Sequence, residues 1–593
     1  MAVVVPAALL LGGCAAMPDA GPVSRVEFSQ GAADKNLQVR VFPVAPNKGE
    51  TPRGMLAGFL DASIADEENY DTARKYLSKG ARARWNPAAG IVVLAGDPAI
   101  SGDRGIGEGE TAAELTASAT QVARIDDNHS YRDSDGEMKA SYTFVKEDGE
   151  WRIDQLPDGL VVNQTNFRNS YRQVSRFFYS GADPSAPTAH EVLVADPIYL
   201  RRRIDPLTAA AKALATGPSQ WLAPVVSTAL DGVTVQHVVV DDSKVARVEI
   251  AGADLAGRLQ FCQRMAAQLF YTLSDQGKSQ IDRLELKSAG GGCSTTRTLS
   301  DQVAPGSLAG GSTATRQYYQ RDDTGQLMVA AEQGEGTPVP GELGKAPAAG
   351  RPEIGTVAVR RDGQRAAAVS ADGHDLYTVG TTGGDTLGKP VLSTTGRFAS
   401  LSWDGRGALW AVDRDQAPKV QLLRDRGAVT VPVDDLGGRT VQSLKVSSDG
   451  VRVALVLKDA TGARTLALAV VTHNGTPDRP VVRISGLHTV APLLTDVASV
   501  SWADTEQLLV LGTEKDRLQQ LYYIGTDGSQ SGDAPLQSAG GMASAAASEG
   551  RDNTSVPSVL AVDGSSLKIY RLTGNQWREV VLPYKANSFF YPG

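Results

Sequence analysis

The sequence predicts a multidomain, mainly β protein that ends in a β-propeller. Three observations support this fold class. The chain has 593 residues, which is more than one hydrophobic core usually organises. Its 62 glycines and its 21% of charged residues are typical of a turn-rich β protein. Its C-terminal half repeats one strand–turn–strand pattern at intervals of 43 to 56 residues.

Residues 1–13 are predicted to be a lipoprotein signal peptide. This apolar run is too short to span a bilayer as a helix. It ends in Leu11-Gly12-Gly13-Cys14, the pattern of a lipobox, so cleavage would leave Cys14 as a diacylglycerol-bearing N-terminus. The run does not open with the usual Lys or Arg, which a translation start upstream of Met1 would explain. The alternative interpretation is an ordinary buried strand.

Residues 14–36 are predicted to be the lipidated cysteine and a tether, and residues 37–185 an α+β region. Apolar residues at helical spacing predict amphipathic helices over 54–66, after Thr51-Pro52, and over 70–79. Alternating residues from 91 to 162 predict strands, including a hairpin with a turn at 147–150. Helices followed by a sheet in this order resemble the nuclear-transport-factor-like domains.

Residues 186–295 are predicted to form an α/β domain. Asp205-Pro206 begins a helix that Gly217-Pro218 ends, and the strands 233–240 and 245–250 form a hairpin. A longer helix and a strand at 281–286 follow. The helix faces inward with Leu259, Ala266, Leu269, Phe270 and Leu273. This order resembles the GerMN domain of sporulation and germination proteins, whose members are binding modules.

Residues 296–593 are predicted to form the propeller, with a linker-rich start. Segments 288–311 and 334–350 are rich in Gly, Ser, Ala and Pro, which is typical of linkers. The repeats that follow place five equivalent residues facing inward: Val359, Trp403, Val446, Trp502 and Ala547. Their spacing matches a four-stranded blade. The one wide interval, of 56 residues, predicts a longer loop at 472–478.

Closure of the ring requires strands from both ends of the propeller region. Residues 318–331 lie before the first clear repeat, and residues 577–582 lie after the last. We predict that both contribute to one closing blade. This gives six blades, with five or seven as alternatives.

Signals for catalysis are weak. The formal net charge of −8 argues against nucleic-acid binding. Gly383 to Lys389 imitates a phosphate loop, but Pro390 stands where Ser or Thr must ligate magnesium. Residues 133–136 are predicted to be a surface turn, and the six histidines are scattered. We therefore predict no catalytic residues, no metal site and no cofactor. The basic run 201–203 is a solvated helix start or, alternatively, a contact for an acidic partner.

Two cysteines remain beside Cys14. Cys262 lies near the start of a predicted helix, and Cys293 follows the strand that returns beside it. An exported compartment permits disulfides. We predict a Cys262–Cys293 bond, the alternative being one buried and one exposed thiol.

Taken together, the lipobox, the α+β region, the GerMN-like region and the propeller resemble the actinobacterial lipoprotein LpqB family. The resemblance implies a lipid-anchored protein on the outer face of the cell membrane, with no enzymatic activity. It also implies a partner, the MtrB sensor histidine kinase of the MtrA–MtrB two-component system, linked to cell-wall growth, division or development. The partner-binding residues stay unknown. The alternative function is a propeller-type hydrolase or lyase of cell-wall glycans.

Overall fold

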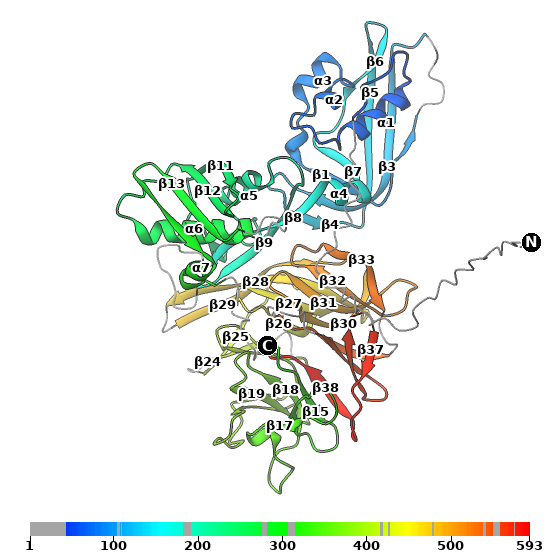
Figure 1. Ribbon diagram of the computed structural model, residues 1–593. Coiled ribbons are helices and arrows are strands. Elements are labelled where there is room, and N and C mark those ends of the chain that lie inside the picture. The colour runs from blue at the N-terminus through cyan, green and yellow to red at the C-terminus, as the bar shows by residue number, and fades with distance from the viewer. Residues whose placement is uncertain are drawn as a thin grey trace, which may run out of the picture. The chain divides into compact units, whose positions relative to one another are not determined.

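The structure is a computed structural model, and it confirms the predicted multidomain, mainly β class (Figure 1). It describes residues 43–593 except 103–106, 108, 182–190, 275–280, 306–314, 416–418, 425–426, 477–478, 538–540, 550–557 and 575. The described residues all belong to one compact unit, Val41–Gly593. The predicted signal peptide, Cys14 and the predicted tether lie outside the described residues. No helix within the described ranges combines the length and the apolar character that crossing a membrane requires.

The first domain packs helices against a sheet with the strand order β6-β5-β3-β1-β7. Its helices are α1 (Pro52–Ala62), α2 (Asp71–Arg74), α3 (Lys79–Arg84), the short η1 (Pro87–Ala89) and α4 (Gln164–Ser170). Its strands are β1 (Ile91–Leu94), β2 (Ala99–Ser101), β3 (Ala112–Ile125), β4 (Tyr131–Asp133), β5 (Glu137–Glu147), β6 (Glu150–Gln155) and β7 (Leu160–Asn163). The predicted hairpin is the antiparallel β5–β6 pair. The likeness to nuclear-transport-factor domains stays a prediction.

The two predicted helices had different outcomes. Thr51 caps α1 by accepting a hydrogen bond from the Gly54 amide, and Pro52 is the first helical residue, as expected. The continuous helix over 70–79 was wrong, because α2 ends at Arg74. Residues 76–78 pair instead with Ile153 of β6, and the Ser78 amide donates to the Ile153 carbonyl at 2.8 Å. A tertiary strand contact therefore overrides the local helical pattern.

The second module contains the strand pair β8 (Tyr171–Ser180) and β9 (Leu193–Arg201) and a sheet of order β11-β12-β13-β14. Its remaining elements are α5 (Pro206–Ala215), β10 (Val226–Ser227), β11 (Thr234–Val240), β12 (Val245–Ala251), α6 (Leu259–Ser274), β13 (Arg283–Ser288), β14 (Gly291–Thr296) and α7 (Arg297–Val303). Helices α5 and α6 share one apolar core with β8 and with the sheet. The predicted helices and the β11–β12 hairpin are confirmed.

Two details of this module differ from the prediction. Leu259 is the first residue of α6, about one turn before the first buried residue Cys262, and its side chain is 60% exposed. The segment from 288, predicted as linker, forms β14 and α7, because its residues add an antiparallel strand to β13. Pairing with a strand already present orders a segment whose composition alone is typical of a loop.

The described residues from 318 onward form six four-stranded sheets, which confirms the propeller. Blade 1 contains β15 (Tyr318–Arg321), β16 (Leu327–Val329), β17 (Thr337–Pro338) and β38 (Ala586–Phe590). Blade 2 contains β18 (Ile354–Val359), β19 (Arg365–Ser370), β20 (Asp375–Gly380) and β21 (Leu392–Ser393), and blade 3 contains β22 (Phe398–Trp403), β23 (Leu409–Asp413), β24 (Lys419–Arg424) and β25 (Gly427–Val431). A short 3₁₀ helix, η2 (Glu342–Gly344), precedes blade 2.

Three more blades complete the ring. Blade 4 contains β26 (Thr440–Val446), β27 (Arg452–Lys458), β28 (Arg464–Thr476) and β29 (Arg479–Thr489). Blade 5 contains β30 (Leu494–Trp502), β31 (Gln507–Glu514), β32 (Gln520–Gly525) and β33 (Gln530–Gln537), and blade 6 contains β34 (Met542–Ala546), β35 (Val559–Asp563), β36 (Ile569–Thr573) and β37 (Gln576–Glu579). Gly363 and Gly450 adopt φ of 71° and 72° in the predicted Asp-Gly turns, a conformation that favours glycine.

The ring closes as predicted in principle but with a different last strand. Residues 318–329 do form part of the closing blade. The C-terminal strand beside them is β38, paired antiparallel with β15, and Figure 1 shows the two side by side. Residues 577–582 were the wrong choice, since β37 ends at Glu579 as the outermost strand of blade 6.

The wide interval in blade 4 is not an irregular loop. Strands β28 and β29 pair from Ala467–Thr489 out to Thr476–Arg479 and thus extend beyond the other blades as a long hairpin. The prediction of a loop at 472–478 was therefore wrong for residues 472–476, and residues 477–478 lie outside the described residues. Extra residues on both strands of a hairpin remain paired, so the insertion lengthens the ladder.

Candidate functional site

The structure joins Cys262 of α6 to Cys293 of β14 by a disulfide, with their Cα atoms 6.1 Å apart. Cys262 is buried in the core of the second module. The predicted lipidation site Cys14 lies outside the described residues.

We predict that the double variant Cys262→Ser/Cys293→Ser lowers the free energy of unfolding by roughly 3–4 kcal/mol. The bond closes a loop with a sequence separation of 31 residues, which restricts the unfolded chain. Chemical denaturation with and without reductant would measure the loss, and the reduced wild type should match the variant. Finding both thiols titratable in native, unreduced protein would contradict the bond.

The sequence motifs that resemble phosphate- or metal-binding sites are loops or buried contacts in the structure. Gly383 to Lys389 lies in the loop between β20 and β21, as predicted. Asp133 is not part of a surface turn, because its Oδ2 accepts a hydrogen bond from the Ala491 amide of the propeller at 2.9 Å. Within the described ranges, no three His, Cys, Asp or Glu side chains gather as metal ligands would.

The basic run 201–203 is not a solvated helix start, because Arg201 is the partly buried last residue of β9, while Arg202 and Arg203 are exposed. The Arg201 guanidinium lies 4.4 Å from the centre of the Tyr70 ring. Arg203 forms an ion pair with Asp66 at 2.9 Å. These arginines therefore connect β9 to the helical part of the first domain.

The innermost strands of the blades are joined by a repeated serine and tryptophan pattern. In blade 3, Ser402 Oγ accepts a hydrogen bond from the Val446 amide of blade 4 at 3.0 Å. Trp403 Nε1 donates in the other direction, to the Ala358 carbonyl of blade 2 at 3.2 Å. The S-x-S-W sequence thus links one blade to both neighbours and satisfies buried polar groups.

Blade 5 repeats this pattern. Ser501 Oγ accepts a hydrogen bond from the Ala547 amide of blade 6 at 3.1 Å, and Trp502 Nε1 donates to the Lys445 carbonyl of blade 4 at 3.0 Å. Trp502 is buried, as predicted for an inward position. The tryptophans that sequence analysis assigned to the core therefore also form hydrogen bonds to adjacent blades.

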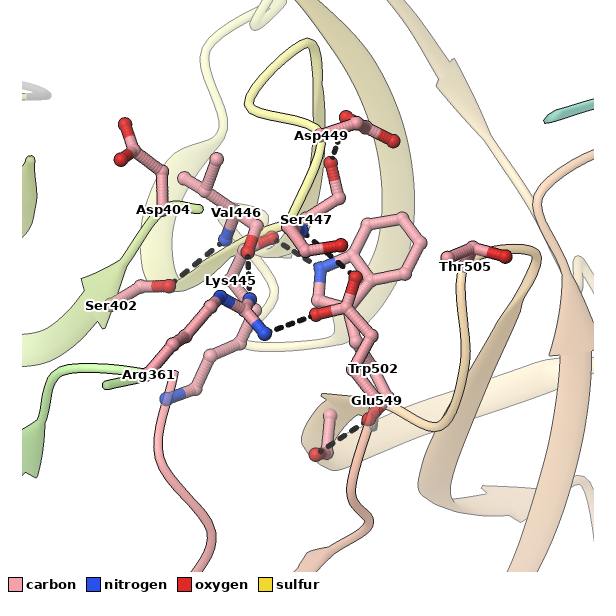
Figure 2. Close-up of polar contacts among 12 residues, drawn as sticks. Arg361, Ser402, Asp404, Lys445, Val446, Ser447, Asp449, Trp502, Thr505 and Glu549 are labelled. Carbon is pink, nitrogen blue, oxygen red and sulfur yellow. Dashed lines mark hydrogen bonds and ion pairs between the residues drawn. The ribbon is translucent and has the colours of Figure 1, made fainter. Parts of the chain in front are cut away.

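Three charged side chains line the central channel between the inner strands: Arg361, Lys445 and Glu549 (Figure 2). The cavity has a volume of about 280 Å³. Arg361 forms an ion pair with Glu549, and both side chains are almost fully buried. The second carboxylate oxygen of Glu549 accepts a hydrogen bond from the Ser448 amide at 2.8 Å. Glu549 is therefore held by partners on two other blades.

Lys445 differs from Arg361 and Glu549, because it takes no part in their ion pair. Its Nζ donates to the Leu401 carbonyl at 3.0 Å. Burial, together with the nearby charge of Arg361, lowers the pKa of Lys445 to about 8. One signal in the sequence could have identified it. Lys445 stands where the equivalent strands of blades 3 and 5 carry Ser402 and Ser501.

A second ion pair, Arg452 with Asp449, lies in blade 4. The side chains are 1% and 7% exposed. Arg452 also donates to the Ala195 carbonyl of β9 at 3.2 Å and to the Thr505 carbonyl of blade 5 at 2.5 Å. One guanidinium therefore contacts two blades and the second module.

The channel differs from the site of a glycoside hydrolase. Such enzymes place two carboxyl groups on either side of the scissile bond. Glu549 is the one carboxylic side chain that lines the channel in the described part of the chain, and Arg361 and the Ser448 amide hold it. The arrangement can stabilise the ring, and it offers no second carboxylic side chain to act as acid or base beside Glu549.

A second polar cluster lies where β4 meets the turn between β32 and β33. Asp133 and Asp527 line a cavity of about 480 Å³ with Trp221 and His488. Burial raises the pKa of Asp133 to about 7 and that of Asp527 to about 6. Asp527 Oδ1 accepts from the Ser529 amide at 2.9 Å. Asp527 thus holds its own turn, whereas Asp133 holds the backbone of the propeller at Ala491. Sequence reasoning missed this cluster because the two carboxyls meet only in the tertiary structure.

Comparison with known proteins gives matches over nearly the whole chain. Family profiles match residues 45–168 as the N-terminal domain of lipoprotein LpqB, 177–290 as a sporulation and spore germination domain, and 325–587 as the LpqB β-propeller domain. Lipoprotein LpqB of Streptomyces avermitilis is 33% identical over 99% of this chain and 97% of its own length, and that of Streptomyces coelicolor is 33% identical over 100% and 97%. TolB from Acinetobacter baumannii aligns at 14% identity over 54% of this chain and 85% of its own, with a TM-score of 0.34.

Proposed function

This chain belongs to the LpqB lipoprotein family, and from that premise we propose that it binds and modulates a sensor histidine kinase at the outer face of the cell membrane. The partner would be an MtrB-type kinase, whose extracytoplasmic domain projects from the same face. The proposal places the protein in signalling linked to cell-wall growth, division or development, and assigns it no enzymatic activity.

The observation that carries the proposal is the use of the channel charges. Enzymes keep acids and bases available to a substrate. Here the channel carboxylate of Glu549 is paired with Arg361, and the buried Asp449 is paired with Arg452. Carboxylates that already form ion pairs within the propeller are not available as acids or bases, which favours a binding scaffold over an enzyme. A lipid anchor at Cys14 would add to this, because confinement to one membrane raises the effective concentration of a partner there.

Exposed apolar side chains offer contact points on both the second module and the propeller. Leu259 at the start of α6 is 60% exposed, and Val239 of the sheet-edge strand β11 is 51% exposed. On the propeller, Leu518, between β31 and β32, is 85% exposed. Specific interfaces depend on a few anchor residues surrounded by contacts of little energetic weight. We propose that these two regions together form the docking surface.

The test measures binding between the full-length protein and the extracytoplasmic domain of the kinase. We expect Leu259→Asp and Leu518→Asp to weaken binding at least tenfold, about 1.4 kcal/mol, because each places a charge in an apolar contact. Val44→Asp is the matched control, since Val44 is an exposed valine of the first domain. It should bind like the wild type. Exposed positions are chosen so that the variants fold.

Failure of the intact protein to bind, even when both proteins share one membrane, would contradict the proposal. The alternative function, a glycan hydrolase or lyase, would then be the favoured one. One observation favours that alternative, namely the two carboxyls Asp133 and Asp527, whose pKa values burial brings close to neutrality. These would be the first residues to substitute in an activity assay on cell-wall fragments.

A further inference from the structure

One side chain of the first domain holds the backbone of the propeller just before blade 5. Asp133, the last residue of β4, accepts a hydrogen bond from the Ala491 amide through Oδ2 at 2.9 Å. Ala491 has a φ of 52°, a left-handed conformation that residues other than glycine rarely adopt. Such a conformation persists where its surroundings hold it, and the bond to Asp133 is one of the contacts that do so.

The same carboxyl packs closely against the turn between β32 and β33. A Cβ atom at Gly528 would lie 2.7 Å from Asp133 Oδ2, so the turn needs glycine to leave room for the carboxyl. Beside it, Tyr199 of β9 forms a hydrogen bond with Ser529 of the turn. Asp133 therefore lies where β4 and β9 of the preceding domains meet two segments of the propeller.

The charge of Asp133 has no counter-charge at this joint. Burial, and after it the charge of Asp527 on the neighbouring turn, raise the pKa of Asp133 to about 7. Burial likewise raises the pKa of Asp527 to about 6. In the part of the chain that the structure describes, no cationic side chain lies within ion-pair distance of either carboxyl. Both carboxyls therefore hold a proton more tightly than exposed aspartates do.

Other ionisable groups face the joint from each element around it. The cavity on one side of Asp133 is lined by Asp126, Arg132, Asp196 and His488, and the cavity on the other side by Asp135, Arg168, Arg172, Arg202, Glu514 and Arg517. Asp196 is paired with Arg176, and Glu514 with Arg517. Burial lowers the pKa of His488 and raises the pKa of Tyr131 and of Tyr199, so these three are neutral at pH 7.

From this geometry we propose that the contact of Asp133 with Ala491 and Gly528 is a proton-controlled latch between the first domain and the propeller. The inference does not rest on the proposed kinase partner. A protonated carboxyl keeps an oxygen that accepts from the Ala491 amide and brings no charge into the joint. An ionised carboxylate accepts the same bond but places an unbalanced charge there, which costs free energy. The latch is therefore tight at acidic pH and loosens when Asp133 loses its proton.

The pH range of the latch follows from the two states of Asp133. Its pKa is about 7 when the latch is closed and 3.8 for an exposed aspartate, so the closed latch binds protons more tightly than the open one. The stabilisation is complete below about pH 4 and is lost as the pH rises through 7. Asp527 acts in the same direction, because its pKa is also raised. Opening should be at least about tenfold more frequent at pH 8 than at pH 5.5.

Hydrogen exchange of the full-length protein, followed by mass spectrometry, measures opening at the Ala491 amide. We expect the protection of the peptide that contains Ala491 to be at least about tenfold lower at pH 8 than at pH 5.5, after correction for the intrinsic effect of pH on exchange. Asp133→Asn keeps an acceptor oxygen and carries no charge, so its protection should not change between the two pH values. Asp133→Ala removes the acceptor and should lower the protection at both.

Asp135→Asn is the matched control, because Asp135 is an exposed aspartate two residues farther along the chain. It should keep the pH dependence of the wild type. Circular dichroism would verify that each variant is folded, and the wild-type comparison still decides if Asp133→Asn does not fold. The proposal is overturned if protection at Ala491 in the wild type does not fall with rising pH, or if folded Asp133→Asn keeps the wild-type pH dependence.

Discussion

Cys14→Ala should transfer essentially all of the protein from the membrane fraction to the soluble fraction, or leave an uncleaved precursor. The thioether to diacylglycerol requires the cysteine sulfur, and alanine has none. Each buried methylene of a lipid chain contributes about 0.8 kcal/mol to membrane binding, so two or more chains hold a protein stably. Cell fractionation would measure the distribution, and mass spectrometry of the N-terminal peptide would detect the lipid.

The control for this experiment is the double variant Cys262→Ser/Cys293→Ser. It also removes cysteines but should remain in the membrane fraction, because it leaves Cys14 in place. Unchanged membrane retention of Cys14→Ala would show that another feature anchors the protein, and the lipobox interpretation would fail.

Arg452→Met should lower the free energy of unfolding by about 3–5 kcal/mol. It removes the guanidinium from Asp449, whose side chain is 7% exposed, and leaves that carboxylate buried without a cation. It also leaves the Ala195 and Thr505 carbonyls without their donor. Denaturation followed by the fluorescence of the propeller tryptophans would measure the loss. The additional change Asp449→Asn should restore part of the stability, because it removes the unpaired charge.

Arg464→Met is the matched control for this prediction. Arg464 lies in the same blade and forms two hydrogen bonds with Asp496, at 2.8 and 2.6 Å, but both side chains are more than one-third exposed. Water and salt screen such a pair, so the loss should stay between about 0 and 1 kcal/mol. Equal losses in the two variants would refute the idea that burial sets the importance of Arg452.

The parts of the fold that were predicted correctly depend on local patterns. Alternation and Asp-Gly turns located the blades, and the tryptophans of the repeats, Trp403 and Trp502, are buried as expected. The Cys262–Cys293 pairing followed from elements close in sequence, and the structure contains this bond. In each case the residues involved lie on one strand, one turn or neighbouring elements.

The candidate sites could not be predicted in the same way. Arg361, Lys445 and Glu549 come from three blades, and nothing in any one repeat indicates that they meet. The repeat pattern could have marked Lys445 as unusual. It could not have indicated that Arg361 pairs with Glu549. Asp133 and Asp527 are separated by most of the chain and lie together only because β4 contacts the propeller.

The sequence by itself therefore determined the mainly β class, the propeller and the inward face of its blades. These depend on the order of neighbouring residues and on the two-residue period of a strand. The tertiary structure alone decided that β38 closes the ring, that residues 76–78 leave the helix to pair with β6, and that the basic run 201–203 joins two domains. These outcomes depend on which surfaces meet, since burial and pairing with distant segments outweigh local preferences of a few tenths of a kcal/mol per residue.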